Sequence, residues 1–183
     1  MRANDLKETL LAIDEEVSLA CGIPPVKSIP PVKSSVIIVG GAAFVLRDLT
    51  SRSVTHDIDV LQADSAVREV ISQYPNVNGA VAAYADQIPY NFEDRLVRLD
   101  LPTLAIDFAT PSTEDLVVMK LYAQRPNDIQ DIEAVARAGR LDWNLLELLV
   151  YSPEEAAASS LSPRRYREMV DAFERFREVC KSK

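Results

Sequence analysis

The sequence contains a single histidine and only two cysteines, Cys21 and Cys180, which lie far apart in the chain. This scarcity excludes a zinc site built from these residues, and it excludes the Cys/His and Ser/His/Asp combinations of nucleophilic catalysis. Two distant cysteines do not make a disulfide framework, so we expect a cytoplasmic protein. The sequence patterns of a Walker phosphate-binding loop and of a dinucleotide-binding fingerprint are also missing.

Long apolar runs and an excess of cations are missing as well. No apolar stretch approaches the roughly 20 residues of a membrane-spanning helix, so we expect no membrane association, and the acidic N-terminal segment has no signal-peptide core. The 183 residues carry a formal charge of -8, which argues against general nucleic-acid binding because phosphate contacts need clustered cations. The 48% hydrophobic and 26% charged content is typical of a globular protein with a proper core.

The order of the predicted elements indicates an α+β fold, with a mixed sheet, flanking helices and a C-terminal helical section. Asn4 can cap a first helix, in which apolar residues recur at helical spacing. The middle of the chain contains a predicted helix from Asp64 to Tyr74 and predicted strands around Asp57 and at residues 36–39, 80–84, 95–99 and 103–108. From Thr110 onward the pattern is helical, with helix starts predicted near Ser112, Pro126, Asp142, Ser152 and Ser162.

The hexapeptide IPPVKS occurs twice in tandem, at residues 23–28 and 29–34. Its paired prolines exclude a helix and favour polyproline II. Such a segment can bind an aromatic-lined groove of a partner, but a duplicated linker at residues 22–35, between the first helix and the first strand, is the simpler interpretation.

The stretch from Val36 to Leu61 carries the sharpest functional signal. It combines a buried strand, a turn at Gly40 and Gly41, a short apolar helix at residues 42–49, and a second strand with Asp57 and Asp59. Side chains alternate across a strand, so the two aspartates share one face while Ile58 and Val60 point into the core. Two carboxylates side by side repel each other, and a bound divalent cation is the usual reason to tolerate this. The alternative interpretation is that Asp57 and Asp59 lie on a solvent-exposed edge strand and bind no metal.

Two later residues have unusual predicted surroundings. Asp107 shares its strand face with Ala105 and Ala109, whose small side chains leave room above the carboxylate. Lys120 lies in a helix that is otherwise apolar almost all round, where an unpaired buried ammonium would be costly. Its long side chain can instead reach the surface.

The segments GGAAFVLRDLTSRSVTHDIDVL and EDLVVMKLYAQRPNDIQDI resemble the nucleotidyltransferase (polymerase-beta-like) superfamily. More narrowly, they resemble the minimal toxin-type nucleotidyltransferases, including AbiEii-like proteins of toxin–antitoxin systems. The resemblance covers roughly residues 36–150. From the resemblance and the order of the predicted elements, we expect a nucleotidyltransferase core over residues 1–110 and a helical section packed on it over residues 111–183.

The resemblance also implies an activity and its partners. The protein would transfer a nucleoside monophosphate from an NTP such as ATP to an acceptor hydroxyl, with two magnesium ions. By this resemblance the acceptor is the 3′ end of a tRNA or another RNA, although a protein or a small molecule stays open. A cognate antitoxin would be a protein partner.

The site residues implied by the resemblance fall into two groups. Catalysis and metal binding involve three carboxylates: Asp57, Asp59 and Asp107. Asp107 is also a candidate general base. Nucleotide binding involves the glycine turn of Gly40 and Gly41, whose backbone can approach phosphates. It also involves Thr55 in the loop before the aspartates, Lys120, and Asp131 of the Asp-x-x-Asp segment.

Two departures from the family pattern concern this site. Ala42 stands where many members have a phosphate-binding serine, and Arg52 is displaced by one position. These departures motivate an alternative hypothesis, a catalytically inactive nucleotidyltransferase fold that serves as a binding or regulatory module.

Overall fold

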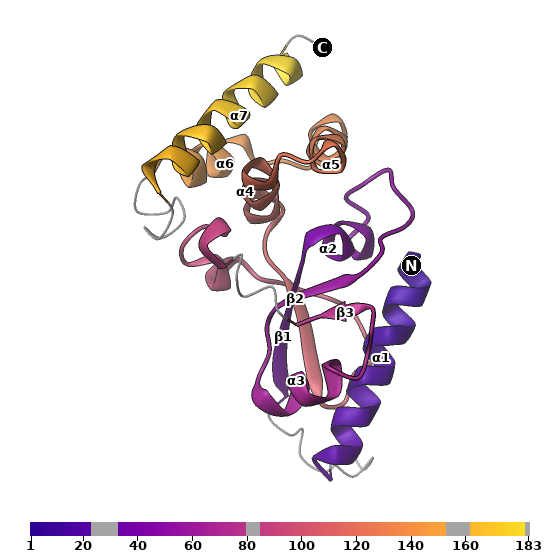
Figure 1. Cartoon of the computed structure of the whole chain (residues 1–183). Helices are drawn as coiled ribbons and strands as arrows, with labels where there is room; N and C mark the ends of the chain where they lie inside the picture. Colours follow the sequence, from indigo (N-terminus) through magenta and orange to yellow (C-terminus); the bar gives the residue numbers. More distant parts are fainter. Residues whose placement is uncertain (23–32, 80–84, 153–161, 182–183) are drawn as a thin grey trace. The chain divides into compact units, whose positions relative to one another are not determined.

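The computed structural model describes residues 1–22, 33–79, 85–152 and 162–181 (Figure 1). Its elements confirm the predicted α+β class. In chain order they are α1 (Ala3–Ala20), β1 (Ser34–Val39), α2 (Gly40–Leu46), β2 (Ile58–Gln62), α3 (Ser65–Ile71), β3 (Val77–Asn78), the 3-10 helix η2 (Phe92–Arg95), β4 (Val97–Arg98), β5 (Ile106–Thr110), α4 (Thr113–Ala123), α5 (Pro126–Arg137), α6 (Trp143–Tyr151) and α7 (Pro163–Lys181).

The chain forms two compact units. The first unit comprises Met1–Arg47, Ser53–Ala82 and Val97–Thr110. The second unit comprises Asp48–Arg52, Ala83–Leu96 and Pro111–Lys183. In the described ranges, no helix is both long and apolar enough to cross a membrane.

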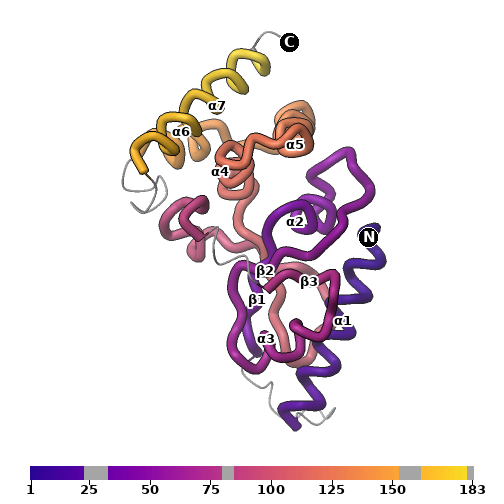
Figure 2. The backbone as a smooth tube through the Cα atoms, in the orientation of Figure 1, coloured from indigo at the N-terminus to yellow at the C-terminus, as the bar shows by residue number. Residues whose placement is uncertain are grey.

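The first unit contains a mixed sheet with β1 at its centre. Within the described residues, five strands form this sheet in the order β3-β2-β1-β5-β4. Strand β1 is antiparallel to β2 and parallel to β5. Residues Val36 to Val39 of β1 are all buried, which is typical of a central strand covered on both faces. Figure 2 follows the backbone from this strand directly into α2.

Helix α1 contacts α2 and α3 and uses its predicted apolar face for this packing. One charged residue, Asp14, is buried on the same helix, at 4% exposure. Its carboxylate accepts hydrogen bonds from the backbone N–H groups of Leu104, Ala105 and Ile106 at 2.7, 2.8 and 2.7 Å. A single side chain therefore ties α1 to the start of β5.

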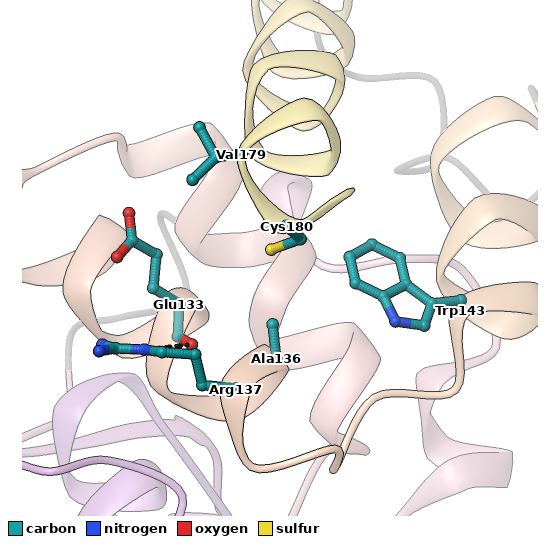
Figure 3. A pocket seen from close by; sticks show the side chains of 6 residues that line it. All are labelled: Glu133, Ala136, Arg137, Trp143, Val179 and Cys180. Carbon is teal, nitrogen blue, oxygen red and sulfur yellow. Dashed lines mark hydrogen bonds between the residues drawn. The ribbon is translucent and has the colours of Figure 1, made fainter. Parts of the chain in front are cut away.

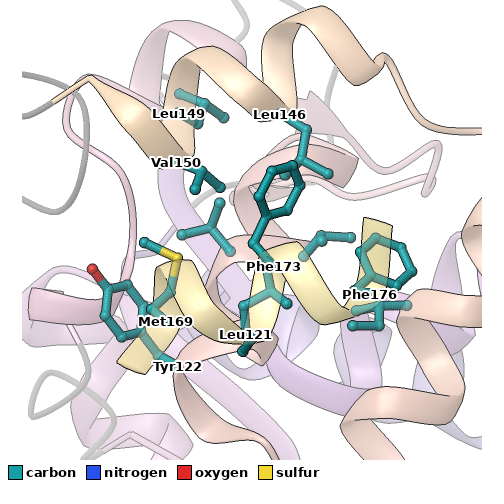
Figure 4. Close-up of a cluster of buried hydrophobic side chains, with 12 residues drawn as sticks. Leu121, Tyr122, Leu146, Leu149, Val150, Met169, Phe173 and Phe176 are labelled. Carbon is teal, nitrogen blue, oxygen red and sulfur yellow. The ribbon is translucent and has the colours of Figure 1, made fainter. Parts of the chain in front are cut away.

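The second unit is built around an apolar core shared by α4, α5, α6 and α7 (Figure 4). Helix α4 is buried almost all round, as its sequence predicts. Trp143 stacks on Phe176 with ring centroids 5.6 Å apart, and Tyr151 meets Phe173 edge to face at the same distance. These aromatic pairs link α6 to α7.

Several predicted boundaries are wrong. Helix α1 is capped by Arg2, whose backbone N–H donates to Asp5 at 2.8 Å, so Asn4 lies inside the helix. The strand predicted at residues 95–99 is limited to β4, and the next strand begins only at Ile106 because Asp14 takes the N–H groups before it.

The aspartate strand and its neighbours also differ from the prediction. Helix α2 includes both glycines and ends at Leu46, Asp57 precedes β2, and α3 ends at Ile71. The strand predicted at residues 80–84, most of the IPPVKS repeat and the first turn of the helix predicted after Ser152 lie outside the described residues.

Candidate functional site

The junction of β1 and α2 requires a glycine at position 40 for two reasons. Gly40 has a φ of +67°, in the left-handed region that side chains other than glycine rarely adopt. A Cβ at this position would lie 2.4 Å from Oδ2 of Asp59, which is well inside contact distance. The glycine therefore lets backbone and carboxylate approach each other closely.

Asp57 and Asp59 have the alternation that the sequence predicts. Ile58 and Val60 are 0% and 3% exposed, whereas Asp57 is exposed and Asp59 is half-buried. Asp59 pairs with Val39, the residue directly before Gly40. Asp59 thus lies where β1 turns into α2, and Asp57 comes directly before β2.

Asn78 and Thr55 lie next to the two aspartates. The Nδ2 atom of Asn78, on β3, donates a hydrogen bond to Oδ1 of Asp59 at 3.2 Å. Thr55 is buried, and its hydroxyl faces the backbone carbonyl of Asp57 at 3.4 Å. The backbone N–H of Thr55 donates to the carbonyl of Met1 at 3.0 Å. Thr55 therefore contacts the main chain of the segment that carries the pair.

The structure does not bring Asp107 to this pair. Asp107 pairs with Ser35 near the start of β1, whereas Asp59 pairs with Val39 at its end. Four residues of strand correspond to roughly 13 Å along β1. The carboxylate of Asp107 instead lies 3.6 Å from Nζ of Lys33 and 3.6 Å from Nη1 of Arg98. Two cations therefore lie next to the carboxylate above which the sequence predicts free space.

The described residues contain no group of three or more His, Cys, Asp or Glu side chains arranged to hold a metal ion. A pair of carboxylates is nevertheless a sufficient protein donor set for magnesium. This ion is commonly bound through one or two carboxylates, with substrate phosphates and water completing its coordination. Asp57 and Asp59 therefore fit a magnesium ion that arrives with a triphosphate, and do not fit a metal held by protein ligands alone.

The other predicted nucleotide-binding residues, Lys120 and Asp131, belong to a buried ion-pair network of the second unit. The Lys120 ammonium lies 2.7 Å from Oδ1 of Asp128 and 2.8 Å from Oδ2 of Asp131. Lys120 is 5% exposed, so the alternative that it reaches the surface is wrong. Arg52 donates to both carboxylate oxygens of Asp131, from Nε at 2.9 Å and from Nη2, and Thr50 donates at 2.5 Å.

This network sets the ionisation of Asp131. Burial by itself raises the pKa of the Asp131 carboxyl, but the hydrogen bonds from Arg52, Lys120 and Thr50 outweigh it and lower the pKa below its ordinary value of 3.8. The sequence interpretation missed Thr50 and left the role of Arg52 unassigned. The available signal was Asp131 itself, which lies on the same helix face as Ile132 and Val135 and so needed cationic partners.

A second ion pair fixes the start of α4. Asp115 is fully buried and accepts from Nε and Nη2 of Arg95 at distances between 2.9 and 3.3 Å. Ser112 caps this helix as predicted, because its hydroxyl accepts from the Asp115 N–H at 3.1 Å. The arginine also donates to the carbonyl of Tyr90 at 2.9 Å, so it joins the segment around η2 to α4.

The second unit also has a shallow pocket of about 300 Å³ between α5, α7 and Trp143 (Figure 3). Its described lining is mostly apolar, with Glu133 and Arg137 on one side. None of the predicted site residues is among these lining residues. The pocket is therefore separate from the predicted chemistry.

Comparison with protein families identifies the group to which the sequence belongs. A family model described as "Nucleotidyltransferase of unknown function (DUF6036)" matches residues 8–181, nearly the whole chain. Searches of curated proteins and of solved structures gave no match. The matched range includes the glycine junction, the aspartate pair and the buried network of the second unit, and the chain therefore belongs to this nucleotidyltransferase family.

Proposed function

We propose that this protein is a magnesium-dependent nucleotidyltransferase whose metal-binding residues are Asp57 and Asp59. The observation that carries the proposal is the close approach of the Asp59 carboxylate to the glycine junction of β1 and α2, with the exposed Asp57 two residues before it in the chain. The family membership supports the same chemistry. An NTP and a divalent metal are what nucleotidyltransferases generally use.

The residues of this site have separable roles in the proposal. Asp57 and Asp59 would hold magnesium, and the backbone at Gly40 and Gly41 would approach the triphosphate without side-chain obstruction. When bound, the metal neutralises charge on the triphosphate and on the leaving pyrophosphate. The acceptor hydroxyl oxygen forms its bond to the α-phosphorus as the bond to pyrophosphate breaks, and the hydroxyl proton passes to water. Thr55 supports the main chain before the pair.

Asp107 is not included in the proposed metal pair, because the strand register keeps it apart from Asp59. The variant Asp107→Asn tests the metal-ligand and general-base role that the sequence predicts for this residue. Lys120 and Asp131 are proposed to contribute to nucleotide binding on the resemblance alone. Because both are buried in ion pairs, their variants need a stability measurement beside any binding measurement.

The acceptor and the biological setting are proposed on the resemblance to the AbiEii-like toxins. We propose an RNA acceptor such as the 3′ end of a tRNA, and a toxin role countered by a cognate antitoxin. Purified protein would be incubated with magnesium, each labelled NTP, total RNA and lysate protein. Label in the RNA pool supports this proposal, and label only in protein or small molecules contradicts it.

The central test is Asp59→Asn, which keeps the shape of the side chain and removes its charge. We expect magnesium-dependent NTP binding, measured by calorimetry, and transfer of labelled nucleotide to be lost, with a melting temperature no lower than that of wild type. Asp100→Asn, an exposed residue of the first unit, is the matched control and should behave as wild type. Wild-type activity in Asp59→Asn would exclude the assigned site. Absence of NTP binding in the wild-type protein would favour the inactive binding module.

A further inference from the structure

Asn78 lies beside Asp59 on the neighbouring strand. Strand β3 is parallel to β2, with Ile58 opposite Val77 and Asp59 opposite Asn78. Ile58 and Val77 are both buried, so Asp59 and Asn78 share the other face of the sheet. The backbone N–H of Ile58 donates to the carbonyl of Asn76 at 2.9 Å, which fixes this register.

The two oxygens of Asp59 have different neighbours. Oδ1 accepts the hydrogen bond from the Asn78 amide at 3.2 Å. Oδ2 faces Gly40, where only the missing Cβ leaves room for it. The carboxylate is thus oriented by an amide on one side and by backbone on the other.

The amide of Asn78 carries no charge, whereas Asp107 and Asp131 have cations next to them. Asp107 lies near Lys33 and Arg98, and Asp131 is bound by cations as well. A cationic partner would cancel the charge that a metal ion needs, whereas an amide donor orients the carboxylate and leaves its charge in place.

We propose that Asn78 is the positioning residue of Asp59 and holds this carboxylate in the orientation that binds a divalent cation. The inference rests on the proposed function, since it assumes that Asp57 and Asp59 form a cation site. Groups that hydrogen-bond to metal ligands fix the ligand orientation, and their loss typically costs tenfold to a hundredfold in metal affinity.

The test uses Mn²⁺ as a paramagnetic probe, titrated into the full-length protein with a non-hydrolysable NTP analogue and followed by electron paramagnetic resonance. We expect Asn78→Ala to raise the dissociation constant for Mn²⁺ roughly tenfold or more. Asn78→Gln, which keeps an amide donor, should recover part of this loss. Asn76→Ala, two residues earlier, is the matched control and should keep the wild-type constant. Asn78 is exposed, so the melting temperature of Asn78→Ala should stay at the wild-type value.

The outcomes separate this inference from the proposed function. If Asn78→Ala binds Mn²⁺ as wild type does while Asp59→Asn does not bind it, the positioning role is overturned and the proposed function stands. A lower melting temperature of Asn78→Ala with unchanged Mn²⁺ affinity would show a merely structural role and also overturn the inference. If the wild-type protein shows no Mn²⁺ binding that depends on Asp59, the proposed function and the inference both fail.

Discussion

Asp59 in the first unit and Asp131 in the second are both aspartates on regular secondary structure, but their surroundings differ in charge. Asp59 is half-buried and has a glycine backbone and an amide as neighbours. Asp131 is fully buried and is bound by Arg52, Lys120 and Thr50. The first carboxylate is half-exposed and accepts a hydrogen bond from an amide, and the second is buried between two cations.

This difference predicts that the two residues support different properties of the protein. Two neighbouring carboxylates repel each other, so we expect the loss of one to leave the stability intact, whereas removing one partner of a buried ion pair leaves an uncompensated charge in the fold. Function and stability should therefore respond in opposite ways to the same Asp-to-Asn change at the two positions.

The largest expected effect on stability is that of Asp131→Asn. Removing one partner of a buried ion pair leaves Arg52 and Lys120 without their shared counter-charge, and we expect a loss of about 3 kcal/mol in the free energy of unfolding. Chemical denaturation monitored by circular dichroism measures this loss. Asp171→Asn, at an exposed position of α7, is the control and should stay within about 0.5 kcal/mol of wild type.

An Asp59→Asn variant that is destabilised as much as Asp131→Asn would contradict this difference between the two aspartates. That result would mean that Asp59 is also a structural residue. We expect the unfolding free energy of Asp59→Asn to equal or exceed the wild-type value, because the change removes one of two like charges.

A smaller effect is expected from pH. The pKa of Asp131 is lowered in the folded state, so this carboxyl binds protons more weakly in the folded than in the unfolded protein. Its contribution to stability is complete well above pH 3.8 and is lost as the pH falls below 3.8 through the folded-state pKa. The difference in unfolding free energy between wild type and Asp131→Asn should therefore shrink in acid. A difference that grows below pH 4 would contradict the assigned ion pairs.

The sequence predicts local features of this molecule well. The alternation around Ile58 and the burial of Val36 to Val39 follow from periodicity, and the caps at Ser112 and Asp142 follow from side-chain chemistry at helix starts. Each of these features depends on residues that are close in the chain.

Features that depend on distant residues could not be predicted. The hydrogen bonds between Arg52 and Asp131 join residues 79 positions apart, and Asp14 reaches backbone groups at least 90 positions away. Asn78 lies in a strand of two residues, which is too short for a period-2 pattern. The alternation of residues 103–108 predicts on which face of the strand Asp107 lies. It does not predict the register of β5 against β1, and this register decides where along β1 the carboxylate lies.

The smallest expected effect concerns Asp107, the predicted site residue that the register sets apart. Its carboxylate is partly exposed and lies 3.6 Å from Lys33 and from Arg98, and such surface ion pairs contribute about 0–1 kcal/mol. We expect Asp107→Asn to lower the free energy of unfolding by no more than that and to keep wild-type Mn²⁺ affinity and nucleotide transfer. Loss of transfer with an intact fold would restore the general-base role predicted from the sequence. Loss of Mn²⁺ binding would show that Asp107 reaches the aspartate pair when the ligand is bound.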